Sequence, residues 1–113
     1  MSAGYLELFI EQGETFSANV SLDQINGSVY DLSNYTVKSD IKKSYWSSNI
    51  SASFITSIDE TDGAIGLYLL ANTTQSLISG RYVYDIFLTN TLTNERSKVL
   101  EGIIFVEPSA TKI

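Results

Sequence analysis

The sequence predicts an all-β protein, an antiparallel β-sandwich of about seven strands with one short helical turn near residues 72–79. Short segments of alternating apolar and polar residues recur along the whole chain, as expected of strands that bury one face. Turn signals rich in Gly, Asn, Asp and Ser separate these segments at intervals of about 8–12 residues. No helical segments alternate with the strands, which disfavours a parallel α/β sheet. An up-and-down barrel is the alternative arrangement.

A chain of 113 residues is typical of one domain, here 1–113, and can bury a core without disulfide or metal staples. Pro108 is the only proline and cannot donate a ladder hydrogen bond, so it should end the last strand. Residues 109–113 are then expected to form a loose tail. The expected strands occupy residues 5–10, 15–22, 35–43, 51–58, 64–70, 80–88 and 96–107.

The segment 80–88 is expected to be the central strand, because its alternation is strict. Its buried face should consist of Tyr82, Tyr84, Ile86 and Leu88.

Three other strands carry apolar residues on both faces. In the last strand, Leu100, Gly102, Ile104 and Val106 share the face expected to point inward, and Ile103 and Phe105 lie on the other. In the first strand, Leu6, Leu8 and Ile10 are expected to point inward. In segment 64–70 the outer face carries Tyr68 and Leu70, so this strand could be covered on both sides.

The segment 71–80 offers one place for a helical turn. Asn72 or Thr73 could cap it, Leu77 could pack beneath it, and Gly80 could end it.

A tyrosine motif follows that turn. Leu77 precedes Gly80, Tyr82 and Tyr84 at spacings that resemble the tyrosine corner of immunoglobulin-like domains, with Tyr84 at the position of the cysteine. We therefore expect an immunoglobulin-like sandwich in which the Tyr82 hydroxyl donates to a backbone carbonyl upstream. The alternative is an aromatic core strand without the corner.

Composition excludes several kinds of chemistry. The chain has no cysteine and no histidine, which removes disulfides, thiol nucleophiles, histidine bases and the usual zinc sites. A net charge of −6 disfavours nucleic-acid binding. No apolar run approaches the roughly 20 residues that span a bilayer, and no signal segment is recognisable at the N-terminus.

No catalytic, cofactor-binding or metal-binding residues are singled out. Asp85 and Glu101 could form a carboxylate pair, but both lie among apolar neighbours in strands, and nothing in a chain with thirteen acidic residues singles them out as catalytic. We therefore expect a protein without enzymatic activity.

The candidate functional residues are apolar side chains on strand faces that should contact water. They would form a patch if their strands are neighbours, as the first and last strands of an immunoglobulin-like sandwich can be. The candidate interface consists of Tyr5, Phe9, Ile103, Phe105 and Tyr68. A second candidate contact is the loop that carries Tyr45 and Trp46, because aromatic side chains at loop ends often contact partners.

Five segments together resemble the small immunoglobulin-like virion proteins of tailed phages. These segments are Ile10–Phe16, Val29–Thr36, Ile41–Ser44, Gly80–Ile86 and Val99–Pro108. The shorter run around Asp31-Leu32 and Tyr35-Thr36 is also similar to the N-terminal modules of siphophage baseplate proteins.

This resemblance implies a structural or adhesive role in the tail, baseplate, neck or capsid decoration. The implied partners are other virion proteins or further copies of the chain, without nucleic acid or membrane. The implied location is the virion, after synthesis in the cytoplasm of a bacterial host. The alternative function is a carbohydrate- or receptor-binding module that uses its exposed aromatic side chains.

Overall fold

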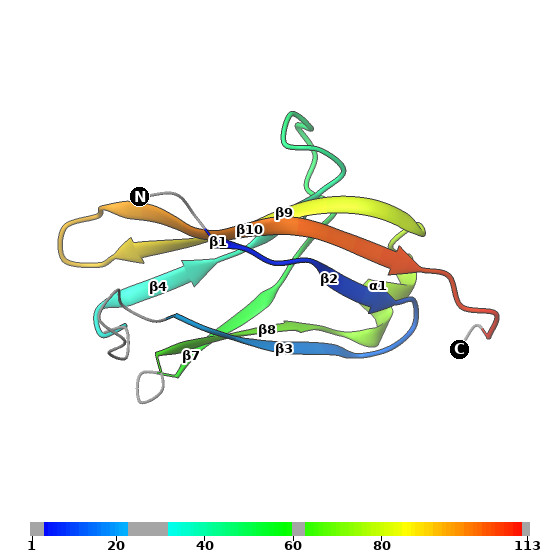
Figure 1. Ribbon diagram of the computed structural model, residues 1–113, viewed down its shortest axis with the longest axis horizontal. Coiled ribbons are helices and arrows are strands. Elements are labelled where there is room, and N and C mark those ends of the chain that lie inside the picture. The colour runs from blue at the N-terminus through cyan, green and yellow to red at the C-terminus, as the bar shows by residue number, and fades with distance from the viewer. Residues whose placement is uncertain (1–3, 23–31, 60–62, 112–113) are drawn as a thin grey trace.

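The computed structural model describes residues 4–22, 32–59 and 63–111, which form two packed β-sheets (Figure 1). The prediction of an all-β sandwich with one short helix is confirmed, and the separate sheets rule out the barrel. The elements are β1 (Gly4–Tyr5), β2 (Leu8–Glu11), β3 (Phe16–Ser21), β4 (Tyr35–Lys38), β5 (Asp40–Lys42), β6 (Ala52–Ser53), β7 (Ile55–Asp59), β8 (Ala64–Leu69), α1 (Ala71–Ser76), β9 (Gly80–Asn90) and β10 (Arg96–Glu107).

The larger sheet is built around β9, as the strict alternation of its sequence predicts. β10 pairs with β9 on one side, and β4 and β5 pair with it on the other, all antiparallel. β1 and β2 add to the far edge of β10 in parallel. The expected adjacency of the first and last strands is therefore confirmed, although the pairing between them is parallel within an otherwise antiparallel sandwich.

The smaller sheet contains β3, β8 and β7 in that order. The expected strand 51–58 divides between the two sheets, because β6 pairs with β5 and β7 pairs with β8. Phe54 lies at the crossing point, buried between the sheets, and its N–H donates to the Ser39 carbonyl at 2.9 Å. The last strand, by contrast, has its predicted bounds, 96–107.

The core contains the inward side chains that the alternation predicts on the two long strands. They include Tyr82, Tyr84, Ile86 and Leu88 from β9, and Leu100, Ile104 and Val106 from β10. The outward-facing positions between them are only partly buried or exposed.

Buried hydroxyl groups are satisfied by backbone carbonyls. Tyr82 donates to the Ile78 carbonyl at 2.6 Å, four residues upstream, as the tyrosine corner predicts. Tyr84 donates to the Leu6 carbonyl at 2.7 Å and so joins the central strand to the first one. This second bond holds the segment between β1 and β2 against the core.

The prediction for Leu6 is wrong, because its side chain is 39% exposed. Its carbonyl group, not its side chain, faces inward, where it accepts the Tyr84 hydrogen bond. The carbonyl lies above Gly102, where a Cβ atom would be only 1.9 Å from the carbonyl oxygen. The expected first strand is therefore interrupted between β1 and β2.

The expected capping of the helical turn is also wrong. The N-cap is Leu70, without a side-chain hydrogen bond, and Gly80 begins β9 with a φ of 140°. Leu77 is buried as predicted.

Buried Thr74 fixes α1 instead, because it contacts the bend after β2. Its Oγ1 atom accepts from the Gly13 N–H at 3.1 Å and lies 2.8 Å from the Glu14 carbonyl, to which it donates.

The chain beyond β10 contacts this bend. The Ser109 N–H donates to the Gln12 side chain at 3.3 Å, so the expected loose tail is held at its first residue. Residues 112–113 lie outside the described residues.

Candidate interface on the outer face of the larger sheet

The outer face of the larger sheet displays every second residue of its strands. Across β9 and β10 the register places Phe105 beside Arg81, Ile103 beside Val83, and Glu101 beside Asp85. A register shift between Lys98 and Leu100 changes which alternate residues of β10 point outward. As a result, Lys98 lies beside Phe87 and Arg96 beside Thr89 on the outer face. From one end to the other, this face therefore changes from apolar to acidic to basic.

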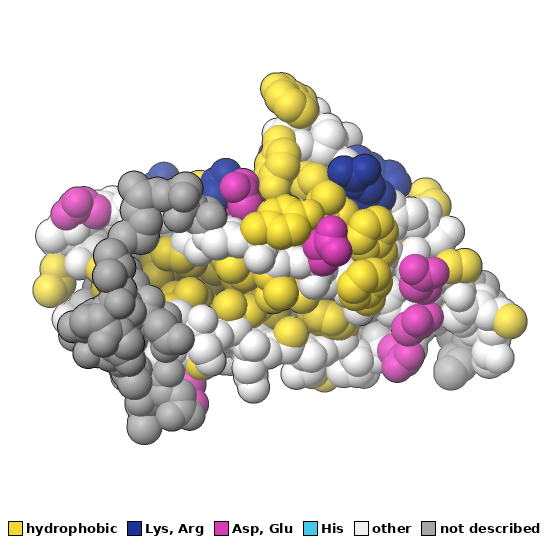
Figure 2. Space-filling view, viewed as in Figure 1, with side chains coloured by type: hydrophobic (Ala, Val, Ile, Leu, Met, Phe, Trp, Pro, Cys, Tyr) yellow, Lys and Arg dark blue, Asp and Glu magenta, His cyan; other side chains and the backbone are white. Residues whose placement is uncertain are grey.

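An outer apolar patch, which we define as Phe9, Phe105, Ile103 and Val83, occupies the first of these zones. Phe9 and Phe105 are opposite one another in the ladder, and their rings stack with centroids 5.3 Å apart and an interplanar angle of 19°. The Phe9 side chain is 63% exposed. In Figure 2 the edge of the sandwich that carries β2 faces the viewer, and apolar side chains gather over β2 and β10. The structure thus brings Phe9, Ile103 and Phe105 together.

Tyr5 lies at the edge of this patch. It pairs with Glu101 in the ladder, is 59% exposed, and donates a hydrogen bond to Glu7 at 3.2 Å. Arg81 lies at the other side, next to Phe105 in the register. The patch therefore has an apolar centre, exposed at Phe9 and partly exposed elsewhere, and charged side chains at its rim.

Tyr68 does not join the patch, because β8 belongs to the smaller sheet. Its ladder neighbour is Ile55, and both side chains are exposed. The possibility that this strand is covered on both faces is not realised.

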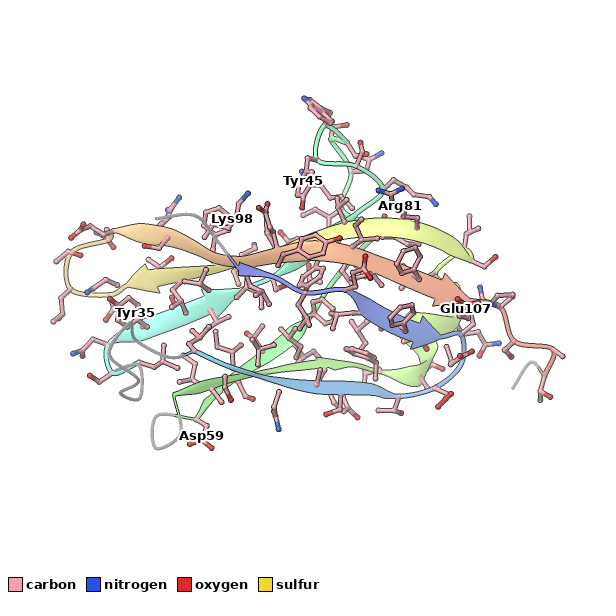
Figure 3. The ribbon with its side chains drawn as sticks, viewed as in Figure 1. Tyr35, Tyr45, Asp59, Arg81, Lys98 and Glu107 are labelled. Atoms are coloured by element: carbon pink, nitrogen blue, oxygen red, sulfur yellow. The ribbon has the colours of Figure 1, made fainter. Side chains whose placement is uncertain are left out.

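The loop between β5 and β6, residues 43–51, projects from the larger sheet (Figure 1). Trp46 is 91% exposed, in a turn where the Ser47 N–H donates to the Ser44 carbonyl at 3.1 Å. Tyr45 is less exposed and leans back over the sheet, where Lys98 Nζ lies 5.5 Å from its ring centroid. Figure 3 shows Tyr45, Lys98 and Arg81 projecting from the same side of this sheet.

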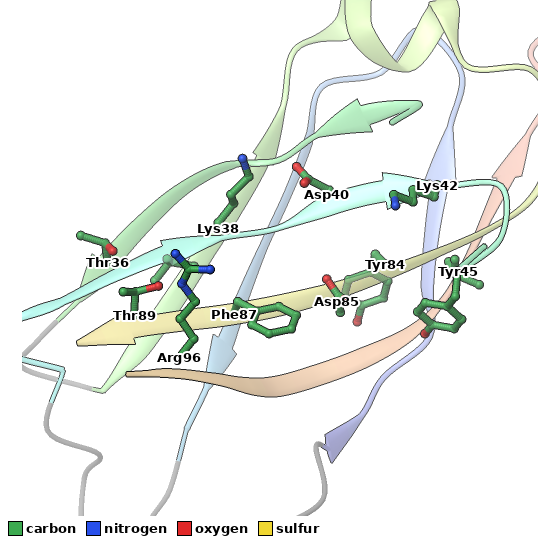
Figure 4. A pocket seen from close by; sticks show the side chains of 12 residues that line it. Thr36, Lys38, Asp40, Lys42, Tyr45, Tyr84, Asp85, Phe87, Thr89 and Arg96 are labelled. Atoms are coloured by element: carbon green, nitrogen blue, oxygen red, sulfur yellow. The ribbon is translucent and has the colours of Figure 1, made fainter. Parts of the chain in front are cut away.

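A groove of about 700 Å³ runs along this face beside the patch (Figure 4). Its floor is β9, one side is β4 and β5, Tyr45 lies at one end and Arg96 at the other. The outward-facing side chains that line it are Thr36, Lys38, Asp40, Lys42, Tyr45, Val83, Asp85, Phe87, Thr89 and Arg96.

Asp85 lies on the floor of this groove and is only partly exposed. Burial raises the pKa of its carboxyl group, and Asp40 and Glu101 add to this effect while Lys98 and Lys42 oppose it. Among the described residues, the Asp85 side chain makes no hydrogen bond and no ion pair. Asp40, by contrast, accepts a hydrogen bond from Ser53 at 2.6 Å.

The groove was not predicted from the sequence. The signal that could have indicated it is the outward series Val83, Asp85, Phe87 and Thr89, which follows from the same alternation as the buried tyrosines. Which side chains of β4, β5 and β10 accompany that series depends on the ladder register, which a single strand does not reveal.

Two further properties bear on function. No helix within residues 4–22, 32–59 and 63–111 is long and apolar enough to cross a membrane. In the same part of the chain, no cluster of three or more carboxylates is placed to hold a metal ion.

No protein-family model matches the sequence, and no curated protein matches it. Among solved structures, the chain is similar to the crystal structure of Listeria monocytogenes InlP, with a TM-score of 0.50 and 17% sequence identity. The match covers 93% of this chain and 27% of InlP, so the chain spans about a quarter of that protein's length. At this identity the similarity shows the fold alone.

Proposed function

We propose that this protein is a non-enzymatic structural component of a phage particle that acts through protein–protein contacts. The resemblance of its sequence segments to small virion proteins of tailed phages supports the location. The outer apolar patch supports the mode of action, because contiguous exposed apolar side chains on neighbouring strands mark contact surfaces. The single observation that carries the proposal is the stacked ring pair of Phe9, whose side chain is exposed, and Phe105, whose side chain is partly exposed.

The occupant that we propose for this patch is a second copy of the chain. The patch is bordered by both signs of charge, with Arg81 at one side and Glu7 and Glu101 at the other. A twofold arrangement of two identical patches can therefore place the cation of one copy opposite a carboxylate of the other.

Sedimentation equilibrium of the wild-type chain and the Phe9→Ser variant tests this proposal. Because Phe9 points outward, the variant should remain folded, and it should sediment with the 12.5 kDa mass of one chain while the wild type associates. Tyr68→Ser is the matched control, since it removes an exposed aromatic ring from the other sheet and should leave association unchanged. A wild-type chain that remains monomeric at high concentration would contradict self-association.

The particle location has its own test. Mass spectrometry of purified phage particles should detect this chain in a fixed ratio to the other structural proteins. Its presence in host lysate but not in purified particles would contradict a virion role.

A second candidate function is a carbohydrate- or receptor-binding module, and the projecting loop favours it. Trp46 is almost fully exposed at a loop end, where its ring is free to stack on a ligand. Binding on a glycan array that disappears in Trp46→Ala would support this function, and binding that persists would exclude Trp46 as the contact.

A further inference from the structure

We propose that the groove on the outer face of the larger sheet binds an acidic oligosaccharide, with Asp85 accepting hydrogen bonds from its hydroxyl groups. This inference goes beyond the protein–protein role. It also specifies a ligand class and a site that differ from the Trp46 contact.

The shape of the groove fits an extended ligand. Its floor follows β9 from Val83 to Thr89, which corresponds to about 20 Å of strand. Tyr45 marks one end and Arg96 the other (Figure 4). An unbranched chain of a few sugar rings can lie along such a floor.

The side chains of the groove combine aromatic surface with hydrogen-bonding groups. The rings of Tyr45 and Phe87 offer flat apolar surfaces at two points along it. Between them, the Asp85 carboxyl group is partly desolvated and has no hydrogen-bonding partner among the described residues, so it is available as an acceptor. Sugar rings present both features that these groups require, apolar C–H faces and hydroxyl donors.

A peptide strand fits this site less well. β9 is paired on one side with β10 and on the other with β4 and β5, so its backbone groups are used in the ladders. Peptides that add to a sheet obtain much of their affinity from backbone bonds at a free edge, and the centre of a face offers none. The groove presents side chains alone, which suits a ligand that carries its own hydroxyl groups.

The charge of the groove indicates an acidic ligand. Three cations, Lys38, Lys42 and Arg96, line it against two carboxylates, although the whole chain has a net charge of −6.

The cations concentrate around one ring. Lys38 and Lys98 lie on either side of Phe87 in the register, and Arg96 lies one step further along. Within the described part of the chain, neither Lys38 nor Arg96 forms an ion pair. Carboxylate groups of the ligand would therefore bind at the Arg96 end, and hydroxyl groups at Asp85.

Isothermal titration calorimetry with tetragalacturonate, maltotetraose and tetraglutamate tests the proposal. We expect binding of tetragalacturonate that weakens as salt is raised, and weaker binding of the other two. Equal binding of maltotetraose would overturn the acidic requirement, and equal binding of tetraglutamate would overturn the saccharide class. Absence of tetragalacturonate binding would overturn the site as a whole.

Variants locate the binding. Arg96→Ala and Asp85→Asn should each weaken tetragalacturonate binding about tenfold, as expected when a charged hydrogen-bonding partner is removed. Lys43→Ala is the charge-matched control, since Lys43 lies next to Lys42 in sequence but does not line the groove. If Lys43→Ala weakened tetragalacturonate binding as much as Arg96→Ala does, the loss would be an effect of net charge, and the proposed site would be contradicted.

Two further variants separate this inference from the proposed functions. Trp46→Ala should leave tetragalacturonate binding unchanged, because Trp46 does not line the groove. Phe9→Ser should abolish association while binding persists, and Asp85→Asn should do the reverse. Loss of binding in Phe9→Ser would show that the groove requires the assembled state and would contradict a site complete in one chain.

Discussion

Replacing Gly102 by alanine should destabilise the sandwich more than any other single methyl addition at its described glycines. Gly102 faces the core from β10, and its φ lies outside the left-handed region, so the effect is one of space alone. The new Cβ would lie 1.9 Å from the Leu6 carbonyl oxygen, 2.8 Å from the Leu6 carbonyl carbon and 3.1 Å from Tyr84 Cε1. Two of these atoms belong to the backbone, which cannot rotate away as a side chain can.

The loss of stability in Gly102→Ala depends on the displacement of Leu6. Displacing Leu6 strains the hydrogen bond from the Tyr84 hydroxyl, 2.7 Å, and the bond from the Leu6 N–H to the Glu101 carbonyl, 3.0 Å. Overpacking costs about 1–3 kcal/mol and each lost hydrogen bond about 1 kcal/mol. We therefore expect the free energy of unfolding to fall by about 3 kcal/mol, and Tm by roughly 12 °C for a domain of this size.

Urea denaturation monitored by circular dichroism measures this loss of stability. Gly66→Ala is the matched control. A Cβ at Gly66 would lie 2.3 Å from Ser57 Oγ, which can rotate to another rotamer, so its cost should stay below about 1 kcal/mol. Tyr84→Phe combined with Gly102→Ala should cost less than the sum of the two single changes, because both act through the Leu6 carbonyl. An unfolding free energy of Gly102→Ala within about 0.5 kcal/mol of the wild type would refute this reasoning.

Three other substitutions test separate contacts. Tyr82→Phe removes the corner hydrogen bond to Ile78 and should cost about 1 kcal/mol in urea denaturation, and a neutral result would leave the corner without an energetic role. Thr74→Val keeps the shape of the side chain but leaves the Gly13 N–H without its acceptor, so it should cost about 1–3 kcal/mol, and an unchanged midpoint would contradict the bridge between α1 and the bend. Asp85→Asn should stabilise the protein at pH 7. Because burial raises the pKa of the Asp85 carboxyl group, the folded state holds its proton more tightly than the unfolded chain does. The wild type therefore loses stability as pH rises through the usual aspartate pKa of about 3.9. The advantage of the variant should disappear at pH 3, and an advantage that is equal at both pH values would show that ionisation is not its cause.

Alternation along single strands could be read from the sequence, and it predicted most of the fold. It placed β9 at the centre and the inward side chains of β10, and Pro108 indicated the end of that strand at Glu107. Three of the expected strands, 5–10, 35–43 and 51–58, are each divided into two in the structure. The Tyr82 hydrogen bond was predictable too, because donor and acceptor are only four residues apart.

Features that depend on two distant segments could not be predicted. The alternation of the first strand places the Leu6 side chain inward, but Gly102, far along the chain, leaves space for the Leu6 carbonyl group instead. The alternation of its strand places Tyr68 outward, but alternation does not reveal to which sheet that strand belongs. The groove requires the registers of several ladders, which follow from packing of the whole sandwich.

The first strand connects the stability of this protein to its proposed assembly. β2 carries Phe9 outward and Ile10 inward, and its pairing with β10 creates the stacked ring pair. Just before β2, the Leu6 carbonyl accepts a hydrogen bond from the buried Tyr84 hydroxyl, and this arrangement requires a glycine at position 102. Substitutions at Phe9 should therefore impair association without unfolding the domain, whereas Gly102→Ala should impair both, because it displaces the chain segment that leads into β2 and Phe9.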